Sequence, residues 1–279
     1  MVKIVDMQPL NPTLTKITFE APHIAKKVKA GQFGIIRVDE DGERFPLTIE
    51  DWDPEKGTIS FVFQIVGGST TRMNHKKPGE YVADVVGPLG NPTDLDGEHI
   101  CVVAGGSGCA IGFPVIRELH KMGKKVDAVI GFRNKDLVVL EDEIRARTGK
   151  CVVRTDDGSY ATKGLVTEGL QSLIDAGEKY DKVITLGPLP MMKFVCQLTK
   201  KYNIHTLASM NPIMVDGTGM CGGCRLTVGG ETKFACVDGP DFDGFKVDFD
   251  EAMGRSRSYT PFERHAYEEA CNLFKKEVK

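Results

Sequence analysis

Three cysteines and one aspartate near the carboxyl-terminal end have the spacing that points most directly to metal chemistry. Plant-type [2Fe-2S] centres take ligands in the order C-x4-C-x2-C, followed by a distant cysteine. Here the spacing is D-x4-C-x2-C-x11-C, formed by Asp216, Cys221, Cys224 and Cys236. A carboxylate is a harder donor than a thiolate, but it carries the same charge and can bind iron. We therefore predict a [2Fe-2S] cluster held by these four residues.

The loop that would surround this cluster is rich in glycine. Its glycines are Gly217, Gly219, Gly222 and Gly223. Because glycine lets the backbone wrap closely around a cluster, this composition favours [2Fe-2S] binding over three other readings. Those are a structural zinc site, three unrelated buried cysteines, and a cluster whose fourth ligand is a distant cysteine. We interpret the other five cysteines, at positions 101, 109, 151, 196 and 271, as packing residues.

A second candidate site is a glycine-rich turn that follows a continuous apolar run and precedes a helical pattern. Its sequence is Gly105-Gly106-Ser107-Gly108-Cys109-Ala110-Ile111-Gly112. Backbone N–H groups at such a turn can bind a pyrophosphate. However, the spacing is not G-x-G-x-x-G, and Arg133 follows the next apolar run where a dinucleotide fold has an acid. The turn alone therefore indicates another kind of nucleotide domain or a simple tight turn.

A third candidate lies nearer the amino-terminal end, in two segments with strand-like neighbours. They are Arg44-Phe45-Pro46-Leu47-Thr48 and Gln64-Ile65-Val66-Gly67-Gly68-Ser69-Thr70-Thr71. An arginine can clamp a phosphate, and backbone groups beside a hydroxyl can hold the edge of a flavin ring. Taken alone, Arg-x-Pro at a strand end is more often a surface feature.

The pattern of apolar residues divides the chain into four parts. Alternating apolar residues, as in the run from Thr58 to Ile65, predict an antiparallel β-barrel over residues 1–97. Short apolar runs that alternate with helical stretches predict an α/β doubly wound domain over residues 98–208. Residues 209–245 form a loop-rich cluster-binding subdomain with little core of its own. Residues 246–279 form a tail whose helix begins at Thr260, with Thr260 as its N-cap, and we expect residues 255–264 to contact a partner.

Composition excludes several classes of protein. The 279 residues carry a net charge of −3, and 41% of them are hydrophobic, which suits about two globular domains. Mixed charge argues against nucleic acid as a partner. The longest uncharged stretch, residues 100–116, contains glycines and a proline and is shorter than the ~20 apolar residues that cross a bilayer. Without an apolar signal-peptide core near Met1, we predict a cytoplasmic protein.

The order of these motifs resembles the ferredoxin reductase family. The match rests on the Arg-x-Pro-Leu-Thr barrel, the glycine turn, the segments 131–136 and 187–192, and the iron–sulfur loop. More narrowly, the chain is similar to the electron-transfer subunits that partner dihydroorotate dehydrogenase B. It is more similar still to the small subunits of NADH-dependent reduced ferredoxin:NADP oxidoreductases, through residues 209–224. The aspartate at position 216 favours the second group, because the dihydroorotate-linked subunits have four cysteines.

The resemblance implies FAD in the barrel and a nicotinamide dinucleotide in the α/β domain. The implied FAD contacts are Arg44, Pro46, Leu47, Thr48, Gln64, Ile65, Val66, Ser69, Thr70 and Thr71. The implied nicotinamide contacts are Gly105, Gly106, Ser107, Gly108, Cys109, Gly187 and Pro188. Many such reductases have a cysteine before the Gly-Pro pair, whereas this chain has Leu186.

The segment Thr155-Asp156-Asp157 favours NADH over NADPH. Similar reductases that use NADP tend to carry Ser-Arg at this place, whereas two carboxylates repel a 2′-phosphate and can accept hydrogen bonds from ribose hydroxyls. The alternative is that these aspartates belong to a solvent-exposed turn without a binding role.

Together these features predict an electron-transfer flavoprotein subunit without a catalytic acid or base. It would move electrons between NAD(H), FAD and the [2Fe-2S] cluster, to or from a larger iron–sulfur flavoprotein subunit. The resemblance suggests electron bifurcation, with ferredoxin and NADP as indirect partners. The alternatives are the electron-transfer subunit of dihydroorotate dehydrogenase B and, from another class, a zinc-stabilised, non-catalytic nucleotide-binding module.

Overall fold

The computed structural model describes residues 1–277, with the side chains of residues 1–270 and 272. Its first domain is a curved antiparallel sheet. Its strands are β1 (Val2–Asn11), β2 (Leu14–Glu20), β3 (Phe33–Arg37), β4 (Arg44–Asp53), β5 (Thr58–Gln64), β6 (Tyr81–Val82) and β7 (Asp84–Leu89). Their order is β6-β1-β2-β5-β4-β3-β7. Only Ala83 separates the two edge strands, so the sheet must curl into a barrel. Two short helices accompany it, α1 (Pro22–Ala25) and α2 (Gly68–His75).

Strand β5 packs on both of its faces, although its alternating apolar residues predict one buried face. Ile59, Phe61 and Phe63 fill the barrel core as the pattern predicts. On the opposite face Val62 is also buried, and it belongs to the apolar core of the second domain. The strand therefore has two apolar faces because the two domains pack against each other there.

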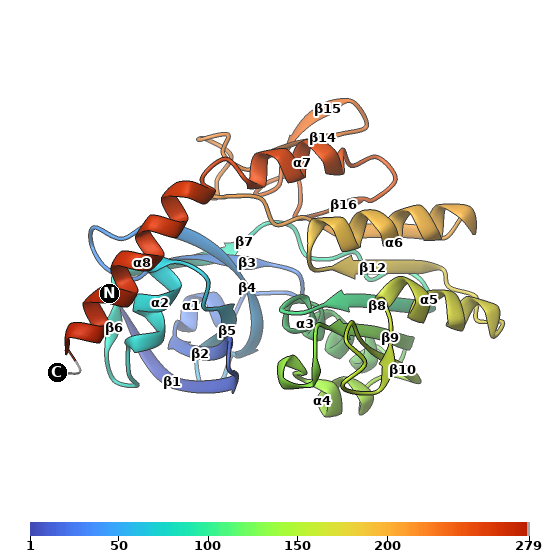
Figure 1. The fold of residues 1–279 in the computed structure, drawn as a ribbon, viewed down its shortest axis with the longest axis horizontal. Coiled ribbons are helices and arrows are strands. Elements are labelled where there is room, and N and C mark those ends of the chain that lie inside the picture. The colour runs from blue at the N-terminus through green and yellow to red at the C-terminus, as the bar shows by residue number, and fades with distance from the viewer. Residues whose placement is uncertain (278–279) are drawn as a thin grey trace.

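The second domain is the predicted doubly wound α/β unit (Figure 1). Its parallel strands are β8 (His99–Gly105), β9 (Lys125–Phe132), β10 (Lys150–Thr155), β11 (Thr162–Lys163), β12 (Lys182–Leu186) and β13 (His205–Ser209). Its helices are α3 (Gly108–Lys121), the 3₁₀ helix η1 (Lys135–Leu137), α4 (Glu141–Arg145), α5 (Val166–Asp175) and α6 (Leu189–Lys201). The strand order β11-β10-β9-β8-β12-β13 reverses direction between β8 and β12, which is where such sheets bind ligands.

The segment after β13 is more ordered than its glycine content predicts. β14 (Arg225–Val228) and β15 (Glu231–Phe234) form a hairpin around Gly229-Gly230. β16 (Asp241–Asp243) then adds to the α/β sheet antiparallel to β13, with Ser209 paired to Asp241. Residues 210–240, called the cluster segment below, therefore form an excursion from the sheet whose two ends lie next to each other.

Two helices complete the described chain, α7 (Phe249–Ser256) and α8 (Thr260–Glu277). Glu263 N donates to Tyr259 O, so Thr260 is already the first helical residue and the predicted N-cap role of Thr260 is wrong, because Tyr259 occupies that position. Helix α8 crosses α2 of the barrel domain, where a Cβ on Gly68 would lie 3.0 Å from Ala266 O (Figure 1). Within residues 1–277, no helix is both long and apolar enough to cross a membrane.

Candidate functional site

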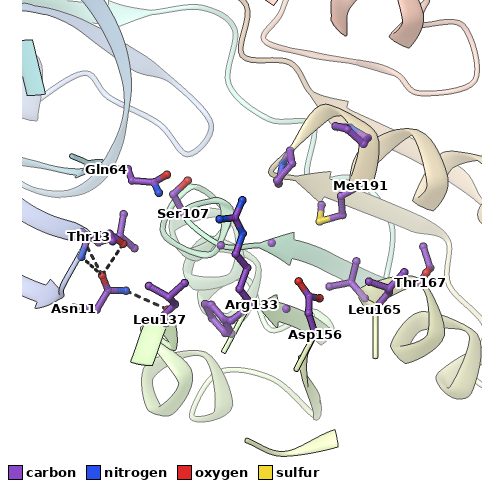
Figure 2. A pocket seen from close by; sticks show the side chains of 18 of the residues that line it. Asn11, Thr13, Gln64, Ser107, Arg133, Leu137, Asp156, Leu165, Thr167 and Met191 are labelled. Atoms are coloured by element: carbon purple, nitrogen blue, oxygen red, sulfur yellow. Dashed lines mark hydrogen bonds between the residues drawn. The ribbon is translucent and has the colours of Figure 1, made fainter. Parts of the chain in front are cut away.

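A cavity of about 500 Å³ opens at the carboxyl ends of β8, β9 and β10 (Figure 2). The end of β8 and the turn after it supply Gly105, Gly106 and Ser107, and helix α6 begins beside Pro188. All four belong to the predicted nicotinamide contacts. The carboxyl ends of parallel strands meet at one edge of the sheet, which explains why residues far apart in the sequence share this cavity.

The glycine turn is shaped by close packing as well as by its open backbone. A Cβ on Gly108 would lie 2.3 Å from Leu186 O, so only glycine lets the start of α3 approach the end of β12 this closely. Cys109 is fully buried, and this burial raises the pKa of its thiol. Both residues lie behind the turn and do not line the cavity. Their predicted role in nucleotide binding would thus be exerted through the backbone.

The two aspartates after β10 are placed differently. Asp156 lines the cavity, whereas the Asp157 carboxylate accepts a hydrogen bond from Ser159 N at 2.9 Å. Hydrogen bonds from Ser159 lower the pKa of Asp157. The structure therefore separates a residue that faces the cavity from one that shapes the turn.

Arg133 also lines the cavity, and sequence reasoning did not select it as a binding residue. Figure 2 shows its side chain between Ser107 and Asp156. Within residues 1–277, neither the Arg133 guanidinium nor the Asp156 carboxylate has a hydrogen-bond or ion-pair partner. The position of Arg133 directly after β9 was the available signal, because this end of β9 lies at the same sheet edge.

A second cavity, of about 300 Å³, lies between the barrel and the α/β domain. The predicted FAD contacts that line it are Pro46, Leu47, Thr48, Gln64, Val66 and Thr70. Gly187 and the methionines Met210 and Met214 line it from the other side. Apolar walls with a few amide and hydroxyl groups fit a flavin ring. Gln64 and Ser107 line both cavities, so the two are adjacent.

The other predicted FAD contacts lie outside this cavity. Ile65 packs against the barrel core, and Ser69 Oγ donates to Glu43 Oε2 at 2.9 Å. Thr71 is buried, and its Oγ1 has no hydrogen-bond partner within the described chain. Arg44 Nε donates to Val215 O at 2.9 Å, and its Nη1 lies 3.3 Å from Asp84 Oδ2. Arg44 thus joins the barrel to the residue that precedes Asp216.

Two of the four predicted cluster ligands lie side by side, and Asp216 is held by backbone groups of the same loop. Cys224 Sγ and Cys236 Sγ lie 3.2 Å apart and are buried. Asp216 Oδ2 accepts hydrogen bonds from Met220 N at 3.1 Å and from Cys221 N at 3.3 Å. A hydrogen bond from Thr218 Oγ1, together with these backbone donors, lowers the pKa of Asp216 to about 2.

The donor set fits a [2Fe-2S] cluster. Cys224 Sγ and Cys236 Sγ lie side by side and could hold one iron ion. The Asp216 carboxylate and the Cys221 thiol belong to one glycine-rich turn, in which Cys221 N donates to Asp216 Oδ2, and they could hold the other.

The Cys236 thiol can bind a metal ion only as a thiolate. Burial and, after it, the hydrogen bond with the neighbouring Cys224 thiol raise the pKa of Cys236, so a metal ion bound here would displace its proton. Of the cysteines interpreted as packing residues, Cys101, Cys109 and Cys196 are buried and Cys151 is partly buried. The side chain of Cys271 lies outside the described residues.

The cluster loop packs directly on the barrel. Gly217 has φ +81°, and a Cβ there would lie 2.8 Å from both Ile35 Cδ1 and Leu89 Cδ1. Met214, two residues before Asp216, lines the flavin-sized cavity. The predicted cluster ligands are therefore held beside the cavity that suits a flavin.

Comparison with known proteins agrees with this arrangement. Residues 211–248 match the family model of the iron–sulfur cluster binding domain of dihydroorotate dehydrogenase B. A dihydroorotate dehydrogenase B electron transfer subunit homolog from Thermotoga maritima is 42% identical, covering 89% of this chain and 88% of that protein. The electron transfer subunit from Streptococcus pneumoniae strain R6 is 33% identical, covering 86% and 95%. A chain in the structure of NADH-dependent reduced ferredoxin–NADP oxidoreductase is 39% identical with a TM-score of 0.90, covering 96% and 97%.

Proposed function

The chain belongs to the family of dihydroorotate dehydrogenase B electron transfer subunits and their homologues, and from this we propose that it carries electrons between NAD(H), FAD and a [2Fe-2S] cluster within a larger complex. One observation carries the proposal. The nucleotide-sized and flavin-sized cavities share Gln64 and Ser107, and the second of them borders the cluster segment at Met214. Three cofactors bound at these places would lie in sequence.

The protein's own residues would bind and orient these groups. When bound, FAD supplies the step between two-electron chemistry with a nicotinamide and one-electron chemistry with an iron–sulfur cluster. Gly105, Gly106 and Ser107 offer an open backbone turn to a pyrophosphate, while Asp156 can accept hydrogen bonds from ribose hydroxyls. Pro46, Leu47 and the other apolar residues around the second cavity would exclude water from the flavin ring. No side chain is required to act as a general acid or base.

The proposal is tested most directly by isolating the protein with its natural partner under anaerobic conditions. Iron, acid-labile sulfide, flavin and subunits are then measured, and NADH is added while the visible spectrum is recorded. We expect FAD, at least two iron ions per chain of this protein in addition to any iron of the larger subunit, and bleaching by NADH. A colourless protein that contains zinc and no flavin would instead support the non-catalytic nucleotide-binding module.

We propose Asp216 as the fourth cluster ligand, with Cys221, Cys224 and Cys236. Replacing an oxygen donor by sulfur changes the electronic structure of the cluster but not its charge, so Asp216→Cys is expected to keep the cluster and to alter its EPR signal and reduction potential. Cys151→Ser, which changes a cysteine outside the apolar core that contains Cys224 and Cys236, is the control and is expected to leave both unchanged. An Asp216→Cys cluster with the wild-type EPR signal and potential would remove Asp216 from the ligand set.

We further propose that the complex is an electron-bifurcating NADH-dependent ferredoxin:NADP oxidoreductase. Supporting observations are the likeness to that enzyme's chain and the aspartate at position 216. The names of the Thermotoga and Streptococcus relatives favour a second candidate, the electron-transfer subunit of dihydroorotate dehydrogenase B. Anaerobic assays of the purified complex distinguish the two: reduced ferredoxin with NADH should reduce NADP in the first case, and NADH should reduce orotate in the second.

We propose residues 255–264 as part of the contact with the larger subunit. Arg255 Nη2 donates to Gly223 O at 3.2 Å, so this stretch begins against the cluster loop, and the side chain of Phe262 is 74% exposed. Phe262→Asp leaves the Arg255 contact in place and is expected to weaken copurification of the partner. Truncation after Met253 would remove the whole stretch. A complex that survives both changes would contradict the proposal.

A further inference from the structure

One wall of the nucleotide cavity comes from the barrel domain rather than from the α/β domain. Asn11 at the end of β1, Thr13 in the turn and Leu14 at the start of β2 line it. Figure 2 shows Asn11 and Thr13 beside Leu137. The other walls are the strand ends and helix starts of the α/β sheet. A ligand in this cavity would therefore touch both domains.

Asn11 forms this turn with its own side chain. Asn11 Oδ1 accepts hydrogen bonds from Thr13 N at 2.9 Å, Thr13 Oγ1 at 3.1 Å and Leu14 N at 2.8 Å. Such an arrangement is typical of an asparagine that replaces a backbone acceptor in a tight turn. The carbonyl half of the side chain is thus fully used within the hairpin.

The amide half of the same side chain reaches the other domain. Asn11 Nδ2 donates to Leu137 O at 3.1 Å, across 126 positions of sequence. Leu137 ends η1, the 3₁₀ turn that begins two residues after Arg133, and Leu137 N donates to Asn134 O. This bond therefore holds the end of η1. The backbone of Arg133 itself is held by Asp157 N, which donates to Arg133 O at 3.2 Å, and its unpartnered guanidinium lines the cavity.

A different contact joins the domains away from the cavity. Arg117 of α3 pairs with Asp51 of β4, and its guanidinium carbon lies 4.3 Å from the centre of the Trp52 ring. None of these three residues lines the nucleotide cavity. The domains would thus stay together without the Asn11 bond, and its loss would free the rim of the cavity alone.

We propose that Asn11 is a positioning residue through which the barrel domain holds the nicotinamide dinucleotide. Its bond to Leu137 keeps η1 in place beside the cavity, directly after the segment from which the Arg133 guanidinium can meet the ligand's diphosphate while Asp156 meets a ribose. The strength of nucleotide binding then depends on a hydrogen bond between the two domains at the rim of the cavity. This inference rests on the proposed function, because it requires the cavity to bind NAD(H).

Asn11→Ser tests the donated hydrogen bond of this side chain apart from the hydrogen bonds that it accepts. A serine hydroxyl can still accept hydrogen bonds in the turn but is too short to reach Leu137. We expect the dissociation constants of NAD⁺ and NADH to rise about tenfold, which corresponds to the loss of one hydrogen bond. Flavin content, iron content and the rate of flavin reduction at saturating NADH are expected to stay at wild-type values.

Arg117→Met is the matched control, because it removes the domain contact that lies away from the cavity. It is expected to lower the melting temperature without changing the dissociation constant of NAD⁺. If Asn11→Ser does not fold, Asn11→Asp keeps all three accepted hydrogen bonds and cannot donate to Leu137 O. That variant is expected to bind NAD⁺ more weakly still, because it also adds a negative charge beside the cavity.

The experiment uses the complete holoprotein, with NAD⁺ binding measured by calorimetry and flavin reduction by stopped flow. Wild-type affinity in folded Asn11→Ser would overturn the positioning role while leaving the proposed function intact. A joint fall of affinity, saturated rate and melting temperature would also overturn it, since a general structural role gives that result. A wild-type holoprotein that binds neither NAD⁺ nor NADH would overturn the proposed function, and this inference with it.

Discussion

The two ends of the parallel sheet contain similar polar residues that are arranged for different tasks. At the amino ends of β8 and β9, His99 Nε2 lies 2.9 Å from Asp127 Oδ2, and Tyr180 donates to the same oxygen at 3.0 Å. At the carboxyl ends, Arg133 and Asp156 line a cavity without a partner in the described chain. The polar groups at the amino ends are hydrogen-bonded to one another, whereas the side chains of Arg133 and Asp156 face the cavity.

The comparison shows that satisfied hydrogen bonds, rather than residue types, distinguish a structural cluster from a binding site. His99, Asp127 and Glu178 place their ligand atoms within 4.8 Å of one another, as a metal site would. However, Glu178 already pairs with Lys125 at 2.9 Å and Lys150 at 2.5 Å. Asp127 Oδ1 also accepts a hydrogen bond from Lys150 N. Because these groups satisfy one another, the amino end needs no ion.

The largest expected effect is on stability, at the amino end. Asp127 is 0% exposed, and Asp127→Ala would leave His99, Tyr180 and Lys150 N without their common acceptor. We expect a loss of about 3 kcal/mol in the free energy of unfolding, measured by urea denaturation. Asp127→Asn retains an acceptor and should lose less. If the folded variants bind NAD⁺ with wild-type affinity, the amino end is structural and the contrast between the two sheet ends holds. If the loss of NAD⁺ binding free energy exceeds the loss of unfolding free energy, the contrast fails.

At the carboxyl end, the expected effect is on nucleotide choice rather than on stability. Asp156→Ser removes a carboxylate from the cavity, so the ratio of kcat/KM for NADPH to that for NADH is expected to rise about tenfold. Asp157→Ser is the control, because that carboxylate is bonded within the turn. An equal rise in both variants would show that the cavity does not separate the two aspartates.

The smallest effect is a pH dependence from Glu178. Hydrogen bonds from Lys125 and Lys150 lower the pKa of Glu178 from 4.5 to about 2. Its contribution to stability is therefore complete above about pH 4.5 and is lost as the pH falls toward 2. Urea denaturation of Glu178→Gln across this range should show less acid destabilisation than the wild type. Glu98→Gln, which changes a side chain that is 91% exposed, is the control and should follow the wild type.

The sequence was sufficient to predict features that depend on local pattern. Alternation predicted β5, and the continuous apolar run from His99 predicted β8 together with the glycine turn that follows it. Asp156 could be placed at the nucleotide cavity because strand ends share one edge of a parallel sheet.

Features that depend on packing between distant segments could not be predicted from the sequence. From the sequence, Asn11 is typical of an ordinary turn. Its hydrogen bond to Leu137 exists only because the two domains meet there. The burial of Val62 on the second face of β5 has the same cause. The hairpin of β14 and β15 was missed because its strands are short and the surrounding glycines suggested a loop, although Gly229-Gly230 is itself a hairpin signal.

The cluster segment is anchored at both ends and along its length. Ser209 and Asp241 pair at the point where it leaves and rejoins the sheet, Gly217 is packed against the barrel, and Gly223 O is bonded to Arg255. An electron carrier fixed in this way does not need to swing between donor and acceptor. The rate at which electrons pass between flavin and iron in this protein is therefore expected not to vary with the viscosity of the solvent, as it would if a mobile arm carried the cluster.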